Sequence, residues 1–252
     1  MATARSAQGV RLVVASALPS PWSEGAKALF RVKQIPAQLV RFARRDDELA
    51  AWTRTHNAPV AFYDDEPPRS GWAEILALAE RLGGRQALIP TSAAARVRLH
   101  GTAHELLGEG GLAWGTRLLM THGSLASDGR ESWPLPVAQY LAAKYGYAPE
   151  QVPAARARAR EVLALLAKQL DESHAAGHTY LLGADVSALD LYLATTLTIV
   201  VPTAAEECPG LSPALGPALA FLNQELGPDL PAALIAHRRM VLDRYLPGPI
   251  AL

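Results

Sequence analysis

The stretch "RLVVASALPSPWSEGAKALFRV", Arg11 to Val32, places a Val-rich run directly before a helical pattern. "RLVVAS" is typical of a strand, and Ser20 followed by Pro21 is typical of a helix start, so we predict a helix from about Pro21 to Val32. A second Val-containing run, "AQLVRFA" at residues 37–43, follows that helix. Strand, helix and strand in this order predict a βαβ unit with a parallel pair of strands.

The next segments complete a small α/β unit. "DDELAAWTRTH", residues 46–56, predicts a helix that begins with acidic residues, and "PVAFYD", residues 59–64, predicts a third strand. "WAEILALAERLG", residues 72–83, repeats apolar residues at helical spacing and ends in Gly83, a typical helix stop. We therefore expect an α/β domain over residues 1–83.

The remainder of the chain has the pattern of a helical bundle. "GGRQALIP" combines paired glycines with a proline, and it predicts a linker over residues 84–91. From 92 to 252 the sequence consists of Ala/Leu/Arg-rich segments with apolar residues at helical spacing and no convincing strand. The fold class expected is an α/β domain followed by an all-α domain over residues 92–252.

One helix start in the second domain is specified by several residues together. In "DVSALDL", Ser187 is a candidate N-cap and Asp190 follows three residues later, as in a capping box, while Val186 and Leu191 occupy the hydrophobic-staple positions. The segment that follows, "ALDLYLATTLTIVV", is apolar on nearly every side. We therefore expect it to form the buried centre of the bundle.

The charge balance, the cysteine count and the apolar runs bear on the class of protein and on its location. The 24 Lys and Arg balance the 24 Asp and Glu, so no overall field favours nucleic acid or an anionic membrane. The single cysteine, Cys208, excludes an internal disulfide framework and suits a reducing compartment. The N-terminus has no apolar run of signal-peptide length, and "YLATTLTIVV" is too short to cross a bilayer. We expect a soluble cytoplasmic protein.

Four short stretches, in this order, resemble the glutathione S-transferase family, and the resemblance covers nearly the whole chain. It implies a thioredoxin-like N-terminal domain that binds glutathione as co-substrate, an all-α domain that shapes the pocket for an electrophile, and commonly a homodimer. Within the family, the chain resembles the serine- and cysteine-type members. The stretches are "SPWSEGAKALF", "NAPVAF", "PRSGWAEIL" and "SALDLYLA".

Ser20 matches the position at which these members carry their catalytic hydroxyl or thiol. The N-terminus of a helix stabilises a thiolate over a thiol, and a hydroxyl that donates a hydrogen bond to the thiolate adds to this effect. The alternative is that Ser20 only caps the helix that begins at Pro21. Trp22 is a candidate contact that could equally serve packing, and Ser23 is a weaker candidate.

Two further stretches carry implied glutathione contacts. Pro59 resembles the cis-proline of the family, whose preceding residue, here Ala58, offers its backbone to the cysteinyl unit; the alternative is a trans proline at a strand start. Ser70 matches the serine that holds the γ-glutamyl carboxylate, although a serine before a helix is often only a cap.

Arg69 departs from the family, which usually has Glu, Gln or Asp beside the γ-glutamyl ammonium. A guanidinium offers no acceptor and repels an ammonium, so either Arg69 points away or the site prefers a different anion. Pro67 and Pro68 compress the turn where the family has a fourth strand, which we expect to be short or absent.

These residues leave two main hypotheses. The first is an enzyme in which a glutathione thiolate attacks a small hydrophobic electrophile, and the second is a non-catalytic binding or scaffold protein with a degraded glutathione site. Thiol–disulfide reduction is disfavoured because serine cannot form a mixed disulfide. Two histidine pairs at helical spacing lack further metal ligands, so we expect no metal site. In the family, the segment containing Trp114, Arg117 and His122 lines the electrophile pocket, although packing or solvent could equally explain these side chains.

Overall fold

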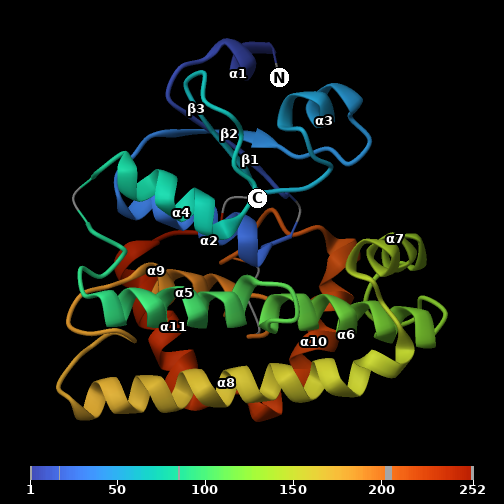
Figure 1. The fold of residues 1–252 in the computed structure, drawn as a ribbon. Coiled ribbons are helices and arrows are strands. Elements are labelled where there is room, and N and C mark those ends of the chain that lie inside the picture. The colour runs from blue at the N-terminus through green and yellow to red at the C-terminus, as the bar shows by residue number, and fades with distance from the viewer. Residues whose placement is uncertain (1, 17, 85, 202–205, 251–252) are drawn as a thin grey trace.

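The computed structural model describes residues 2–16, 18–84, 86–201 and 206–250. A small three-stranded sheet with its own helices lies on a broad layer of longer helices (Figure 1). The predicted fold class, a thioredoxin-like α/β part followed by a helical part, is confirmed. The predicted linker, 84–91, includes residue 85, which lies outside the described residues.

The sheet has the strand order β2-β1-β3. The central strand β1, Val10–Val14, is buried along its whole length, as expected for a strand covered on both faces. It pairs in parallel with β2, Ala37–Arg41, which confirms the predicted βαβ unit, and antiparallel with β3, Val60–Tyr63. The expected fourth strand is reduced to one bridge, in which Ala61 and Arg69 exchange backbone hydrogen bonds of 2.8 and 2.9 Å.

Helices cover both faces of this sheet. Helices α2, Pro21–Val32, and α4, Trp72–Arg81, contact each other between the sheet and the helical layer (Figure 1). Helix α3, Asp47–Thr53, covers the other face, where Trp52 stacks on Phe62 with ring centroids 4.3 Å apart. Because α3 ends at Thr53, it is shorter than the helix predicted over residues 46–56. A five-residue helix, α1, spans Ala2–Ser6 and was not predicted, because its sequence has no apolar periodicity.

The second part of the chain is helical in all its regular elements among the described residues. Short 3₁₀ turns at 149–151, 213–215 and 227–229 connect some of the helices. No described helix is long and apolar enough to span a membrane. The α-helices of this part are α5 Ala93–Leu107, α6 Leu112–Ala126, α7 Leu135–Tyr145, α8 Val152–Ala175, α9 Ala188–Leu197, α10 Gly216–Leu226 and α11 Ala232–Tyr245.

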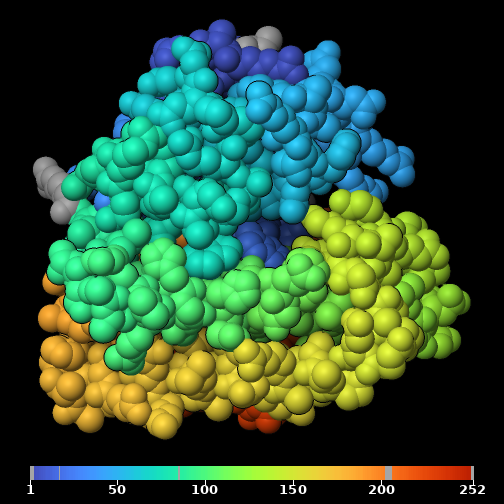
Figure 2. All heavy atoms as spheres, viewed as in Figure 1, coloured from blue at the N-terminus to red at the C-terminus, as the bar shows by residue number. Residues whose placement is uncertain are grey.

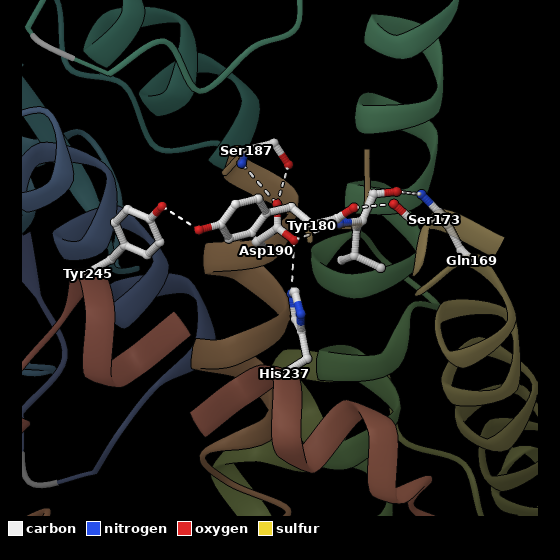
Figure 3. Close-up of polar contacts among 8 residues, drawn as sticks. Gln169, Ser173, Tyr180, Ser187, Asp190, His237 and Tyr245 are labelled. Carbon is white, nitrogen blue, oxygen red and sulfur yellow. Dashed lines mark hydrogen bonds and ion pairs between the residues drawn. The ribbon is translucent and has the colours of Figure 1, made fainter. Parts of the chain in front are cut away.

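Helix α9 is the centre of the bundle, as its composition predicts. All of its residues are buried, and it packs against α2, α5 and α11. The side chain of Asp190 organises its start (Figure 3): Oδ2 accepts hydrogen bonds from the Ser187 backbone at 2.9 Å and the Ser187 hydroxyl at 2.7 Å. Its Oδ1 accepts from the Leu181 backbone and from Nε2 of His237, both at 2.9 Å. The predicted capping box is therefore present, and it also holds α11.

The glycine-rich segment after α5 separates two helices. Helix α5 ends against Gly108, and α6 begins after Gly111 as its N-cap. A Cβ at Gly111 would lie 2.6 Å from the carbonyl oxygen of Glu105, closer than real Cβ contacts. The glycine is required here because the two helix ends approach so closely.

Candidate functional site

A hollow lies between the α/β part and the helical layer, beside the segments that carry the predicted site residues (Figure 2). Figure 2 shows this hollow with blue atoms near the start of α2 visible inside it. The segment around β3 and the start of α4 lies above it, the region of α5 and α6 lies below it, and α7 lies at one side (Figures 1 and 2). A site here would draw residues from both parts of the chain, as ligand sites between domains commonly do.

Ser20 is the N-cap of α2 by position but not by bonding. Its side chain is 6% exposed and its backbone is extended, with φ −72° and ψ 124°, yet the hydroxyl makes no capping hydrogen bond. Among the described residues, the hydroxyl has no other hydrogen-bond partner. Capping therefore does not explain this hydroxyl, which remains available to a ligand at the positive end of the helix.

Ser23 has a structural role in the same turn. Its side chain is fully buried, and its hydroxyl accepts a hydrogen bond of 3.0 Å from the backbone of Ala15. This bond ties the first turn of α2 to the residue that directly follows β1. The weaker of the two serine candidates is thus accounted for by the fold.

Trp22 belongs to the contact between the two parts of the chain. Its Nε1 donates a 2.7 Å hydrogen bond to the carbonyl oxygen of Leu107 at the end of α5. Its ring stacks against Tyr145 of α7 with centroids 6.4 Å apart. Packing therefore fixes Trp22, and it forms part of the wall between Ser20 and the helical layer.

The loop before β3 contains the predicted cis proline. The Ala58–Pro59 peptide bond is cis, and the backbone N–H of Ala58 donates to Oδ1 of Asn57 at 3.0 Å. The same oxygen accepts a 2.8 Å hydrogen bond from Nζ of Lys144. Helix α7 thus reaches across the hollow to the residue beside Ala58, a contact that no sequence pattern indicates.

Arg69 is paired with a carboxylate of its own turn. Its Nη2 lies 2.5 Å from Oε2 of Glu66, and Arg81 of α4 lies 2.6 Å from the same oxygen. Hydrogen bonds from Arg81 and Arg69 lower the pKa of Glu66, so the carboxylate is charged at neutral pH. The guanidinium of Arg69 is thus neutralised locally.

Ser70 lies one residue before the cap of α4. It is exposed, and Gly71 is the N-cap, so Ser70 does not cap this helix. The carboxylate of Glu74 folds back over this start: a Cβ at Gly71 would lie 1.7 Å from Oε2 of Glu74. The positive end of α4, which suits an anion, thus already has a carboxylate of the chain against it.

A group of aromatic and cationic side chains lies where α6 and α7 pack against the start of α2. Trp114 packs edge-on against Tyr145, with centroids 4.7 Å apart, and Arg117 lies 5.7 Å from the ring centroid of Trp22. Burial lowers the pKa of Arg117, and burial followed by the charge of Arg117 lowers that of Lys144. By contrast, His122 bonds to the hydroxyl of Tyr147 at 2.9 Å. We predicted neither Lys144 nor Tyr145 as a site residue.

Metal ligands and other cavities add little to this picture. No group of three or more potential metal ligands occurs among the described residues. A groove of about 750 Å³ runs along another face of α2, against β2 and α11, but none of the predicted site residues lines it. Its ionic side chains include the close pair of Lys27 and Glu24, 2.7 Å apart.

Comparisons with known proteins bear on the domain and the fold of this chain. Residues 149–222 match the family model "Glutathione S-transferase, C-terminal domain". Residues 149–222 are thus similar to the C-terminal domain of glutathione S-transferases, and the fold of the chain is similar to that of the solved structures described next. A comparison with curated protein sequences gave no match.

Solved structures with the glutathione S-transferase fold cover nearly the whole chain. A glutathione S-transferase domain-containing protein from Marinobacter aquaeolei VT8 is 15% identical, with 93% of this chain and 98% of that chain covered and a TM-score of 0.64. A glutathione S-transferase from Methylobacillus flagellatus KT, solved with glutathione bound, is 12% identical, with coverage of 96% and 100% and a TM-score of 0.63. One from Methylobacterium radiotolerans JCM 2831, in complex with glutathione sulfonate, is 14% identical, with coverage of 96% and 97% and a TM-score of 0.60.

Proposed function

We propose that this chain is a glutathione-dependent transferase. In this proposal the glutathione thiolate lies at the start of α2, takes a hydrogen bond from Ser20, and attacks a small hydrophobic electrophile held in the hollow. The observation that carries the proposal is the Ser20 hydroxyl, which stands at a helix N-terminus without a capping bond. Glutathione bound to a protein of the same fold supports it.

The chemistry follows from the position of Ser20. The thiol of glutathione, a cysteine side chain, has a reference pKa of about 8.5 and is mostly protonated at neutral pH. The dipole of α2 and a hydrogen bond from Ser20 both favour the charged form, so they lower this pKa. Each unit of lowering corresponds to about 1.4 kcal/mol of preferential thiolate binding. The protein thereby raises the fraction of glutathione that is nucleophilic.

The remainder of the tripeptide would bind along the α/β part. The backbone of Ala58 beside the cis proline would pair with the cysteinyl unit, and Ser70 with the start of α4 would receive the γ-glutamyl carboxylate. The Glu66–Arg69 pair removes the objection raised by Arg69, because its guanidinium already has a carboxylate partner. Trp22 would serve as the wall that separates this half of the site from the electrophile.

Calorimetric titration with glutathione tests the proposal. We expect the wild type to bind glutathione. At high pH, where the thiolate is the bound form, we expect Ser20→Ala to bind glutathione more weakly than the wild type does. Ser92→Ala is a matched control, since Ser92 caps α5 through an actual bond to the Ala95 backbone. We expect that control to lose about 1 kcal/mol of stability without a change in glutathione affinity. Absence of binding by the folded wild type would refute the proposal.

A non-catalytic binding or scaffold role is the second candidate, because two glutathione contacts are occupied by the chain itself. Glu74 lies over the start of α4, and the Ala58 N–H is bonded to Asn57. The two candidates differ in whether glutathione displaces these side chains. Binding that appears only after Glu74→Gln would favour the scaffold role.

Three features of the proposal come from sequence and resemblance alone. They are the homodimer, the cytoplasmic location, and the boundary between a domain of residues 1–83 and one of residues 92–252. Sedimentation of the purified chain would test the dimer directly.

A further inference from the structure

Arg117 of α6 is a buried cation with no carboxylate partner among the described residues. Its side chain is 4% exposed and lies between the rings of Trp22 and Trp133, 5.7 Å from each centroid. Its polar contacts are the sulfur of Met120 at 3.7 Å and a hydrogen bond with the Tyr145 side chain. A guanidinium remains protonated in proteins, so this positive charge is buried without a counter-charge.

A second cation lies close to the first. Lys144 of α7 is partly buried, its Nζ bonds to the neutral amide of Asn57, and the charge of Arg117 helps to lower its pKa. Burial raises the pKa of Tyr145, so its phenol is neutral and does not balance either charge. The region where α6 meets α7 thus concentrates positive charge that the described part of the chain does not neutralise.

A ligand can supply the missing charge. Burying an unpaired cation is costly, and pairing it with an anion in a site of low dielectric recovers much of that cost. Arginine also binds carboxylates through two parallel hydrogen bonds. The rings of Trp22, Trp114 and Tyr145 beside it offer stacking surfaces to a planar molecule.

We propose that the electrophile half of the site selects an aromatic acceptor that carries a carboxylate, and that Arg117 binds this carboxylate. The transfer of glutathione to this acceptor rests on the proposed function, whereas the binding of its carboxylate by Arg117 does not. Arg117 belongs to α6 of the helical layer, whereas the contacts proposed for glutathione belong to the α/β part, so the carboxylate belongs to the acceptor. In this proposal Tyr145, the hydrogen-bond partner of Arg117, moves aside to admit the ligand.

A pair of substrates that differ only in this charge tests the inference. 4-Chloro-3,5-dinitrobenzoate and its methyl ester share the same reactive carbon. In both, the glutathione sulfur forms a bond to that carbon, chloride leaves, and the thiol proton passes to solvent. We expect the wild type to have a higher kcat/KM for the acid, relative to the uncatalysed rates, by about tenfold or more.

Three variants assign the preference to Arg117. In Arg117→Met we expect the acid-to-ester preference to fall to about unity, and in Arg117→Lys we expect part of the preference to remain. Arg98→Met, at an exposed position of α5, is the control and should keep the preference. Arg117→Met should melt close to the wild type, because the variant removes the cost of a buried unpaired charge together with the contacts of Arg117 to the two tryptophan rings. An unchanged preference in folded Arg117→Met, or an equal loss for acid and ester, would overturn the inference.

A binding measurement separates the failure of this inference from failure of the proposed function. 3,5-Dinitrobenzoate and its methyl ester have no leaving group, and their binding is followed by quenching of tryptophan fluorescence without glutathione. Preferential binding of the acid that Arg117→Met abolishes would support the inference even if no transfer occurs. Transfer to the ester without any preference for the acid would support the proposed function and overturn this inference.

Discussion

At the scale of single residues, the site differs from an ordinary helix start in what Ser20 does not do. The hydroxyl of a serine that caps a helix accepts a hydrogen bond from a backbone N–H, as that of Ser92 does at α5. The same residue type at the same cap position therefore has two bonding states in this chain, and only one of them leaves the hydroxyl to a ligand. Sequence places both serines correctly but cannot distinguish these states, because the difference is a side-chain orientation.

Glu74 gives a prediction about glutathione affinity. Its carboxylate lies over the start of α4, where it repels the γ-glutamyl carboxylate and competes for the same backbone groups. We expect Glu74→Gln to bind glutathione about two- to fivefold more tightly by calorimetry, in line with the weight of an exposed charge at a helix end. Glu131→Gln, an exposed acid distant in sequence, serves as control. Equal affinity in wild type and Glu74→Gln would contradict the expectation.

Glu24 gives a prediction about pH. Burial raises the pKa of its carboxyl above the ordinary value of 4.5, although Lys27 opposes this. The folded state therefore favours the protonated form, and the corresponding stability is present below pH 4.5 and is lost as the pH rises through the raised pKa. We expect Glu24→Gln to melt higher than the wild type at pH 7 and equally at pH 4, as measured by calorimetry. A variant that is less stable at pH 7 would show that the ion pair with Lys27 outweighs burial.

At the scale of elements, Asp190 connects three segments of the helical part. It accepts four hydrogen bonds from buried donors at the start of α9, in the preceding turn and on α11. Removing it leaves those donors unsatisfied, so we expect Asp190→Ala to lose about 3 kcal/mol or more of unfolding free energy in urea. Asp46→Ala, which removes a single cap bond at α3, should lose only about 1 kcal/mol. Similar losses in the two variants would contradict the structural role given to Asp190.

The junction of α5 and α6 gives a second prediction at this scale. Gly111 approaches the Glu105 carbonyl too closely for a side chain, whereas Gly101, inside α5, has no atom near its Cβ position. We expect Gly111→Ala to destabilise the protein by about 1–3 kcal/mol, and Gly101→Ala to stabilise it by about 0.5–1 kcal/mol through helix propensity. Chemical denaturation of both variants measures the contrast. If Gly111→Ala were as stable as the wild type, the junction would have room for a Cβ atom that the structure does not show.

At the scale of the whole molecule, local patterns predicted most of the fold. The βαβ unit, the bounds of α2 and the start of α9 all follow from residues within a few positions of one another, where propensity and capping act. The short helix α1 lacks such a pattern. Contacts between distant segments have no such local pattern: His237 reaches Asp190 at the start of α9 across 47 positions, and Lys144 reaches Asn57 beside the candidate site across 87. Pairings of this kind depend on tertiary packing, so a single sequence does not indicate them.

The central claim is that the start of α2 and Ser20 hold glutathione as a thiolate. Ultraviolet difference absorbance of bound glutathione, titrated against pH, measures the pKa of its thiol directly. We predict a value clearly below the reference of about 8.5 in the wild type and a return toward that reference in Ser20→Ala, with Ser92→Ala unchanged. A bound thiol that titrates near 8.5 in the wild type, or identically in Ser20→Ala, would contradict the account.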